Sequence, residues 1–123
     1  MDKELKTKGE MDYDFTNDIL FFKVKNREYS KSVEFNNMVI DIDKENFVVG
    51  IQIFEASKLF LLSKIALRRV PDWQFQAKVM NKMIEIRLFF QVVYRNKPIR
   101  MNPIIMKDLS NSLPTSQLVA VPV

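Results

Sequence analysis

The chain has 123 residues, of which 47% are hydrophobic and 28% charged, the size and composition of one globular domain. It contains neither histidine nor cysteine, which excludes disulfides, Ser-His-Asp or Cys-His catalysis, and zinc sites built from those residues. The sequence has no apolar run of about 18 residues and no signal peptide. We therefore predict a cytoplasmic protein with no membrane partner and, because no residue titrates near neutrality, no enzyme.

The formal net charge of +4 is distributed unevenly along the chain. Residues 1–55 carry eight Lys or Arg and twelve Asp or Glu, a net charge of −4. Residues 56–123 carry eleven and three, a net charge of +8. This asymmetry predicts either a basic surface for an anionic partner, or two complementary halves that pack together or pair across a dimer.

The first half of the chain predicts short strands. Residues 1–10 are polar and of mixed charge, and we expect them to form a flexible leader. Beyond them, apolar or alternating stretches are separated by turn residues such as Asn36-Asn37. The predicted strands cover 12–15, 19–24, 32–35, 38–43 and 47–53. Their spacing of about ten residues is typical of an antiparallel meander.

Gly50 interrupts the β-branched run that ends this meander. A phosphate-binding loop needs several glycines at set spacing directly before a helix, so a lone strand glycine instead predicts a bulge or a close backbone approach. From Glu55 to Ala66 the apolar residues recur at helical spacing, and Pro71 ends the pattern. We predict one helix there, covering one face of the sheet.

Alternation with period two returns after Pro71. It predicts a hairpin of residues 73–80 and 84–94 with a tight turn at Asn81-Lys82, followed by a last strand over 99–106. Pro103 within that strand indicates a sheet edge. The predicted fold class is therefore α+β: an antiparallel β-meander with one covering helix, then a C-terminal β-hairpin and an edge strand.

These elements define a single domain over residues 11–108. Residues 109–123 are rich in Ser and Asn and contain two prolines, which predicts a tail, disordered or bound to a partner. Its end, residues 117–121, could add as a strand to a sheet edge.

Residues 12–58 carry five short motifs in a fixed order. They are Tyr13-Asp14, Asp18-Ile19-Leu20, Val39-Ile40-Asp41-Ile42-Asp43, Val48-Val49-Gly50-Ile51-Gln52-Ile53 and Ala56-Ser57-Lys58. In this order they resemble domain-of-unknown-function family 2283, a family of small prokaryotic proteins. Gln52 departs from the family, which often has an acidic residue there, as does Asn46, where the family turn often has Gly. The resemblance implies a short meander followed by a helix, no established activity and, by analogy with some relatives, an antitoxin-like role.

A group of carboxylates in the first half is a candidate for binding a hard cation such as Mg²⁺. Its members are Asp12, Asp14, Asp18, Asp41, Asp43 and Glu45. The alternative is that they are turn residues whose carboxylates bind their own backbone. Because no Ca²⁺-loop spacing is present, we expect no metal and no cofactor.

The outward face of the predicted C-terminal hairpin offers two candidate surfaces. A ribbon that presents basic and amide side chains can follow phosphates, and an aromatic ring among them can stack on a base. The nucleic-acid candidates are Lys78, Arg87, Phe89, Gln91, Arg95 and Arg100. Apolar residues on the same face predict a protein interface, most simply a homodimer. The interface candidates are Met80, Phe89, Val93, Ile104 and Met106.

The sequence favours a non-enzymatic interaction module, homodimeric and regulatory, that neutralises or controls another protein. The alternative is a nucleic-acid-binding protein that uses the basic hairpin. A third hypothesis is a carboxylate-dependent metal enzyme.

Overall fold

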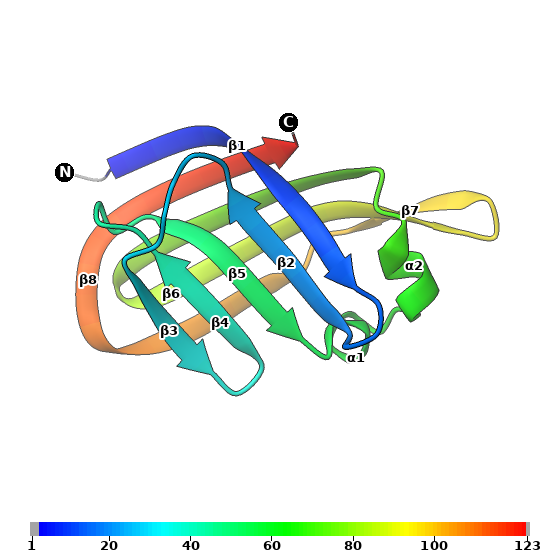
Figure 1. Ribbon diagram of the computed structural model, residues 1–123, viewed down its shortest axis with the longest axis horizontal. Coiled ribbons are helices and arrows are strands. Elements are labelled where there is room, and N and C mark those ends of the chain that lie inside the picture. Colours follow the sequence, from blue (N-terminus) through cyan, green and yellow to red (C-terminus); the bar gives the residue numbers. More distant parts are fainter. Residues whose placement is uncertain (1–2, 123) are drawn as a thin grey trace.

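The computed structural model describes residues 3–122, which form one eight-stranded mixed sheet and two short helices (Figure 1). The strands are β1 (Lys3–Asp14), β2 (Ile19–Val24), β3 (Lys31–Phe35), β4 (Met38–Ile42), β5 (Val48–Phe54), β6 (Asp72–Tyr94), β7 (Lys97–Met101) and β8 (Ile104–Pro122). The helices are α1 (Ala56–Phe60) and α2 (Lys64–Arg68). The protein is thus nearly all-β, and the predicted α+β class is correct only in the coarser sense of a sheet with some helix.

The strand order in the sheet is β3-β4-β5-β2-β1-β8-β6-β7. The pairs are antiparallel except β1 with β8, which run parallel. The predicted meander is therefore only partly present. Strands β3, β4 and β5 pair consecutively, but β5 then pairs with β2, so the chain from β2 to β3 crosses to the edge of the sheet.

The first and last described segments, residues 3–14 and 104–122, are strands, whereas the sequence predicted a flexible leader over 1–10 and a tail over 109–123. Residues 117–121 of that tail pair as a strand, as the sequence also suggested. Residues 3–9 of β1 pair with residues 116–122 of β8, and the other edge of this part of β8 pairs with β6. Ser116, Leu118 and Ala120 are buried. They alternate with half-buried neighbours, as in a strand. Their burial and pairing stabilise a segment whose Ser and Pro content predicted disorder.

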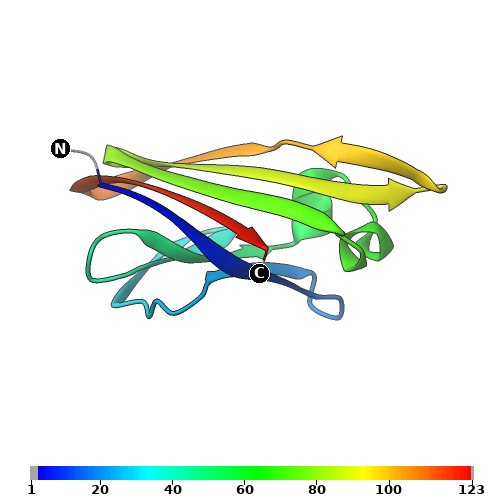
Figure 2. The same ribbon diagram turned by 90° about the horizontal axis from the view of Figure 1, so that it is seen from above.

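β6 and β8 are both long and sharply bent. The first half of β6 pairs with the end of β8 and its second half with the beginning of β8, and the register shifts between Val79 and Met83. Asn81 has a left-handed φ of 59°, which Asn tolerates better than most residues. The chain bends there, but the predicted hairpin with a tight turn at Asn81-Lys82 is wrong, because residues 72–94 form one strand and both of its halves pair with β8. The two halves of β6 diverge from the bend (Figure 1, Figure 2).

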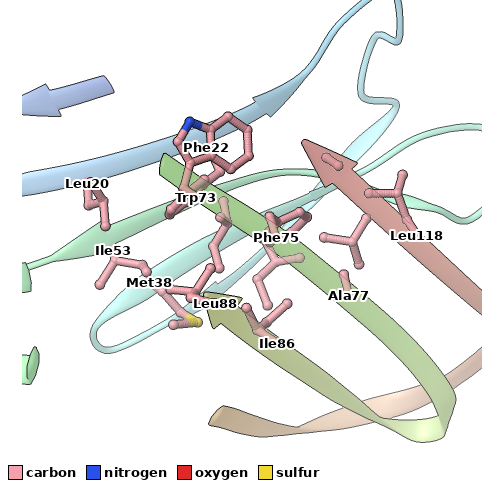
Figure 3. Close-up of a cluster of buried hydrophobic side chains, with 14 of the residues drawn as sticks. Leu20, Phe22, Met38, Ile53, Trp73, Phe75, Ala77, Ile86, Leu88 and Leu118 are labelled. Atoms are coloured by element: carbon pink, nitrogen blue, oxygen red, sulfur yellow. The ribbon is translucent and has the colours of Figure 1, made fainter. Parts of the chain in front are cut away.

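The bend places β6, β7 and β8 over β2–β5, with the core between them (Figure 2). Phe22 of β2, in the lower layer, contacts two aromatic residues of β6 in the upper layer. Its ring packs edge-on against Trp73 at 5.3 Å between centroids and stacks on Phe75 at 5.7 Å. Figure 3 shows Leu20, Met38 and Ile53 from the lower layer meeting Ile86, Leu88 and Leu118 from the upper one.

The single helix predicted over 55–66 is wrong, because the segment forms two five-residue helices. Leu61 ends α1 with a left-handed φ of 56°, and the Ser63 Oγ then caps α2 by accepting from the Ala66 N–H at 3.1 Å. Ala56 and Phe60 of α1 and Ala66 and Leu67 of α2 are buried, so each helix still packs two residues into the core. None of the helices within residues 3–122 has the length and apolar character needed to cross a membrane.

Candidate functional site

The second half of β6 presents its odd-numbered side chains outward. Ile84, Ile86 and Leu88 are buried, whereas the residues between them reach the surface. Across the ladder Glu85 pairs with Met106, Arg87 with Ile104, Gln91 with Arg100 and Val93 with Pro98. We call the surface formed by these eight residues and Phe89 the outer face.

A hollow of about 520 Å³ opens at one side of the outer face, where the two halves of β6 have diverged. It is lined by Asp72, Trp73, Gln74, Phe89, Phe90, Gln91, Arg100, Met101, Asn102, Val121 and Pro122. We call it the β6 hollow. Three of the six nucleic-acid candidates, Phe89, Gln91 and Arg100, meet in it. Sequence alternation identified these three, but their meeting depends on the divergence of β6, which leaves no mark in the sequence.

The other three nucleic-acid candidates lie outside the β6 hollow. Arg87 forms an ion pair with Glu85, with 2.7 Å between its Nε and the carboxylate oxygen. Arg95 occupies the tip of the β6–β7 hairpin, where it and Asn96 both have positive φ, as in a two-residue type I′ turn. Lys78 lies on the first half of β6, four residues beyond Gln74 in the hollow wall.

The interface candidates divide into exposed and half-buried residues. Val93 is 44% exposed and Ile104 and Met106 are each 51% exposed, all on the outer face. Met80 and Phe89 are half-buried, Phe89 in the wall of the β6 hollow. Three large apolar side chains thus meet solvent on one face.

The six carboxylates proposed from the sequence as a cation site do not form one cluster. Within residues 3–122 no three carboxylates are placed to hold a metal ion together. The carboxylates accept hydrogen bonds from separate partners, which are Asn17 for Asp14, Ser57 for Asp18, Ser32 for Asp41 and Arg27 for Asp43. Only the Asp14–Asn17 contact is local; the partners of Asp18, Asp41 and Asp43 lie 39, 9 and 16 residues away. Asp12, Asp14 and Asp43 also accept from nearby backbone N–H groups, as the turn-residue alternative predicts.

Asp18 is different because its carboxylate forms hydrogen bonds with residues of two other family motifs, Tyr13 and the distant Ser57. Its carboxylate accepts from the Tyr13 hydroxyl at 2.6 Å, from Ser57 Oγ at 2.6 Å and from the Ser57 N–H at 3.0 Å. Burial acts to raise the pKa of Asp18, but the hydrogen bonds from Ser57 and Tyr13 outweigh it and hold the pKa below its ordinary value. Burial, together with the hydrogen bond and negative charge of Asp18, raises the pKa of Tyr13. This cluster ties the β1–β2 turn to α1, a role that the sequence did not reveal.

The sequence predicted a bulge or a close backbone approach at Gly50, and the structure fits the bulge, because the β4–β5 register shifts beside it. In register Gly50 lies between Lys23 of β2 and Asp41 of β4, and the shift comes just after Asp41. A Cβ atom on Gly50 would lie 3.0 Å from the Asp41 carboxylate. The neighbour that comes close is thus a side chain from the adjacent strand, and it accepts a hydrogen bond from Ser32 Oγ at 2.6 Å.

The fold and the Asp18 cluster define a mostly β protein built on one bent sheet, and comparison with known proteins places it in a family. The family described as "Protein of unknown function (DUF2283)" matches residues 10–57. A Methanosarcina mazei protein named "Putative hypoxanthine phosphoribosyltransferase" is 33% identical over 86 residues, 70% of each chain. An uncharacterized protein of Methanocaldococcus jannaschii is 30% identical over 93 residues, 75% of this chain and 80% of the relative.

The chain therefore belongs to the DUF2283 family, which confirms the resemblance seen in the sequence. The matched segment runs from the middle of β1 to the start of α1 and contains Tyr13, Asp18 and Ser57. It excludes the outer face and the β6 hollow. No solved structure matches the chain.

Proposed function

We propose that the protein is a non-enzymatic interaction module, which forms a homodimer through the outer face and regulates or neutralises a protein partner. The observation that carries this proposal is the exposure of Val93, Ile104 and Met106 on one face of the β6–β8 ribbon. The hairpin that ends this ribbon projects beyond the rest of the fold (Figure 1), so the face is open to a second molecule.

The energetics favour such an interface. Full burial of an aliphatic side chain contributes about 1.5–3 kcal/mol, and three such residues lie on one face. Arg87 and Arg100 stand beside them, cross-strand from Ile104 and Gln91, and would form the polar rim that protein interfaces have. A two-fold axis through the face would bring the same apolar patch of both copies together.

Sedimentation equilibrium of the wild type over a range of concentrations tests the dimer. We expect a mass twice that of the chain, and a dissociation constant raised about tenfold or more by Ile104→Glu, because a carboxylate would then be buried in the interface. The matched control is Ile65→Glu, which changes a 70% exposed residue of α2 outside the outer face. A wild type that stays monomeric, or equal effects of the two variants, would contradict the dimer.

Nucleic-acid binding is the second candidate function, supported by the charge of the C-terminal half. Arg95, Lys97 and Arg100 lie on the exposed β6–β7 hairpin, and residues 56–123 carry a net charge of +8. Neutralising phosphates releases counterions, so the affinity for single-stranded RNA or DNA should fall steeply with salt concentration. Absence of binding at low salt would remove this candidate.

Two enzymatic alternatives have less support. Phosphoribosyl transfer, the activity in the name of the Methanosarcina mazei relative, needs a backbone cradle for pyrophosphate. Gly9 and Gly50 both lie within strands, and neither has a positive φ. The carboxylate-dependent metal enzyme has no cluster of ligands within residues 3–122.

A further inference from the structure

We propose that the β6 hollow binds a nucleotide: the base stacks on Phe89, the hollow's amide side chains bind the base edge, and Arg100 binds the phosphate. This inference goes beyond the interaction module and rests on the second candidate function, for which it supplies a site. The ligand is a base with its phosphate, which could be a free nucleotide or part of a single strand.

The shape of the hollow suits such a ligand. Its volume of about 520 Å³ lies within the range of about 300–1,000 Å³ that small-ligand sites occupy. One wall comes from residues 72–74 and 121–122, and the other from residues 89–91 and 100–102. All wall residues except Asn102, which lies between β7 and β8, belong to strands. The two walls include residues from the two halves of β6, which diverge from the bend (Figure 2).

Phe89 supplies the stacking surface. The neighbouring odd-numbered positions of β6 hold Arg87 and Gln91, so Phe89 is an aromatic ring among polar residues on an outward face. It is half-buried in the wall of the hollow. An aromatic ring in this setting can stack on any of the bases, because every base has a π-face.

The polar side chains of the hollow have free hydrogen-bonding capacity. The side chains of Gln74, Gln91 and Asn102 make no hydrogen bond to any residue in the described range 3–122. An amide group offers both a donor and an acceptor, which matches the edge of an unpaired base. The Asp72 carboxylate in the wall can accept from the amino group of a base.

Arg100 supplies the positive charge. It is exposed, it pairs in register with Gln91, and it forms no ion pair within residues 3–122. Arg87, by contrast, is paired with Glu85. A guanidinium without a carboxylate partner is well suited to bind phosphate through two parallel hydrogen bonds.

The hollow contains its own reporter. Trp73 is the only tryptophan of the chain, it lies in the wall of the hollow, and it is 8% exposed. We would titrate the protein with AMP, UMP, oligoadenylate and oligouridylate while following Trp73 fluorescence, and measure oligonucleotide affinity by anisotropy. Quenching by the mononucleotides would assign the hollow to free nucleotides, and quenching by the oligonucleotides alone would assign it to single strands. Either result supports the site.

Two pairs of variants locate the contact. Phe89→Ala should weaken binding about tenfold, whereas Tyr94→Ala, which removes an exposed aromatic outside the hollow, should leave it unchanged. Arg100→Gln should weaken binding more than Arg95→Gln, although both remove one positive charge. Thermal unfolding of each variant verifies that the fold is intact.

Three results would overturn the site. Oligonucleotide binding that Phe89→Ala leaves unchanged would place nucleic acid elsewhere on the protein and leave the second candidate function standing. Absence of quenching and of binding at low salt would remove both the site and that function. Loss of dimerisation in Phe89→Ala without any nucleotide binding would make the hollow part of the protein interface instead.

Discussion

Lys107 of β8 and Asn37 of the β3–β4 turn are 70 residues apart in sequence, yet the Lys107 Nζ donates a hydrogen bond of 2.8 Å to the Asn37 Oδ1. The ammonium also lies 5.5 Å from the centre of the Phe35 ring. The contact joins the beginning of β8 in the upper layer to the far edge of the lower layer. Side chains thus link β8 to the edge strand β3, although the two strands are not neighbours in the sheet.

Replacing Lys107 by methionine should lower the free energy of unfolding by about 1–2 kcal/mol, the usual contribution of a hydrogen bond from a charged donor with a cation–π contact. Methionine preserves most of the aliphatic stem, so the change isolates the ammonium. The measurement is urea unfolding, with Lys97→Met at an exposed position of β7 as the control. Equal stabilities of the two variants would show that the link contributes nothing.

Asp18 should make the protein sensitive to acid. Its pKa is lowered in the folded protein, so its contribution to stability is complete above the ordinary carboxyl pKa of about 4 and is lost as the pH falls through the folded value. Asp18→Asn keeps a residue that tolerates the left-handed φ of 57° but loses the carboxylate. At neutral pH this variant should be about 1–2 kcal/mol less stable than the wild type, and the gap should narrow below about pH 4. A gap that is independent of pH would contradict this account.

Tyr13 should act at the opposite end of the pH range. Its pKa is raised in the folded protein, so its contribution is complete below the ordinary phenol pKa of about 10 and is lost as the pH rises beyond that. Tyr13→Phe removes the hydroxyl that donates to Asp18 and should cost about 1 kcal/mol at neutral pH. Thermal unfolding at increasing alkaline pH should bring the two proteins together above about pH 10, and parallel curves would exclude the effect.

The two glycines should differ in their tolerance of alanine. A Cβ on Gly9 would lie 2.9 Å from the Lys23 carbonyl oxygen, which is backbone and cannot move alone, whereas on Gly50 it would meet the Asp41 carboxylate at 3.0 Å. Gly9→Ala should therefore cost about 2 kcal/mol and Gly50→Ala about 1 kcal/mol or less. Adding Asp41→Ala should relieve the cost at Gly50 only, as a double-mutant cycle by urea unfolding would show. The reverse order would contradict the geometry.

The sequence predicted most local features, because they depend on neighbouring residues. Alternation identified the buried and exposed sides of β6, Asn81 marked its bend although not the predicted hairpin turn, and the lone Gly50 indicated the irregularity beside Asp41. The parallel pairing of β1 with β8 was missed, since it depends on contacts more than 100 residues apart. The inward positions of β1 also include Thr7 and Gly9, whose small side chains disguise the strand pattern.

The prediction of one helix and the prediction of the site were incomplete for different reasons. Apolar spacing predicted one helix, but Leu61 adopts a left-handed conformation that its residue type does not favour, so no local signal marked the break. Phe89, Gln91 and Arg100 could be assigned to one face by alternation alone. That they line a hollow with Gln74 and Asn102 follows from the bend of β6, a property of the whole sheet.

The central claim is that the outer face is the binding surface through which the protein associates with itself. Amide chemical shifts recorded by NMR across a dilution series test it directly. The account predicts concentration-dependent shifts at Arg87, Val93, Ile104 and Met106, and none at Ile65 of α2. The claim would be contradicted by shift changes confined to another surface. It would also be contradicted by the absence of shift changes over a concentration range in which the molecular mass changes.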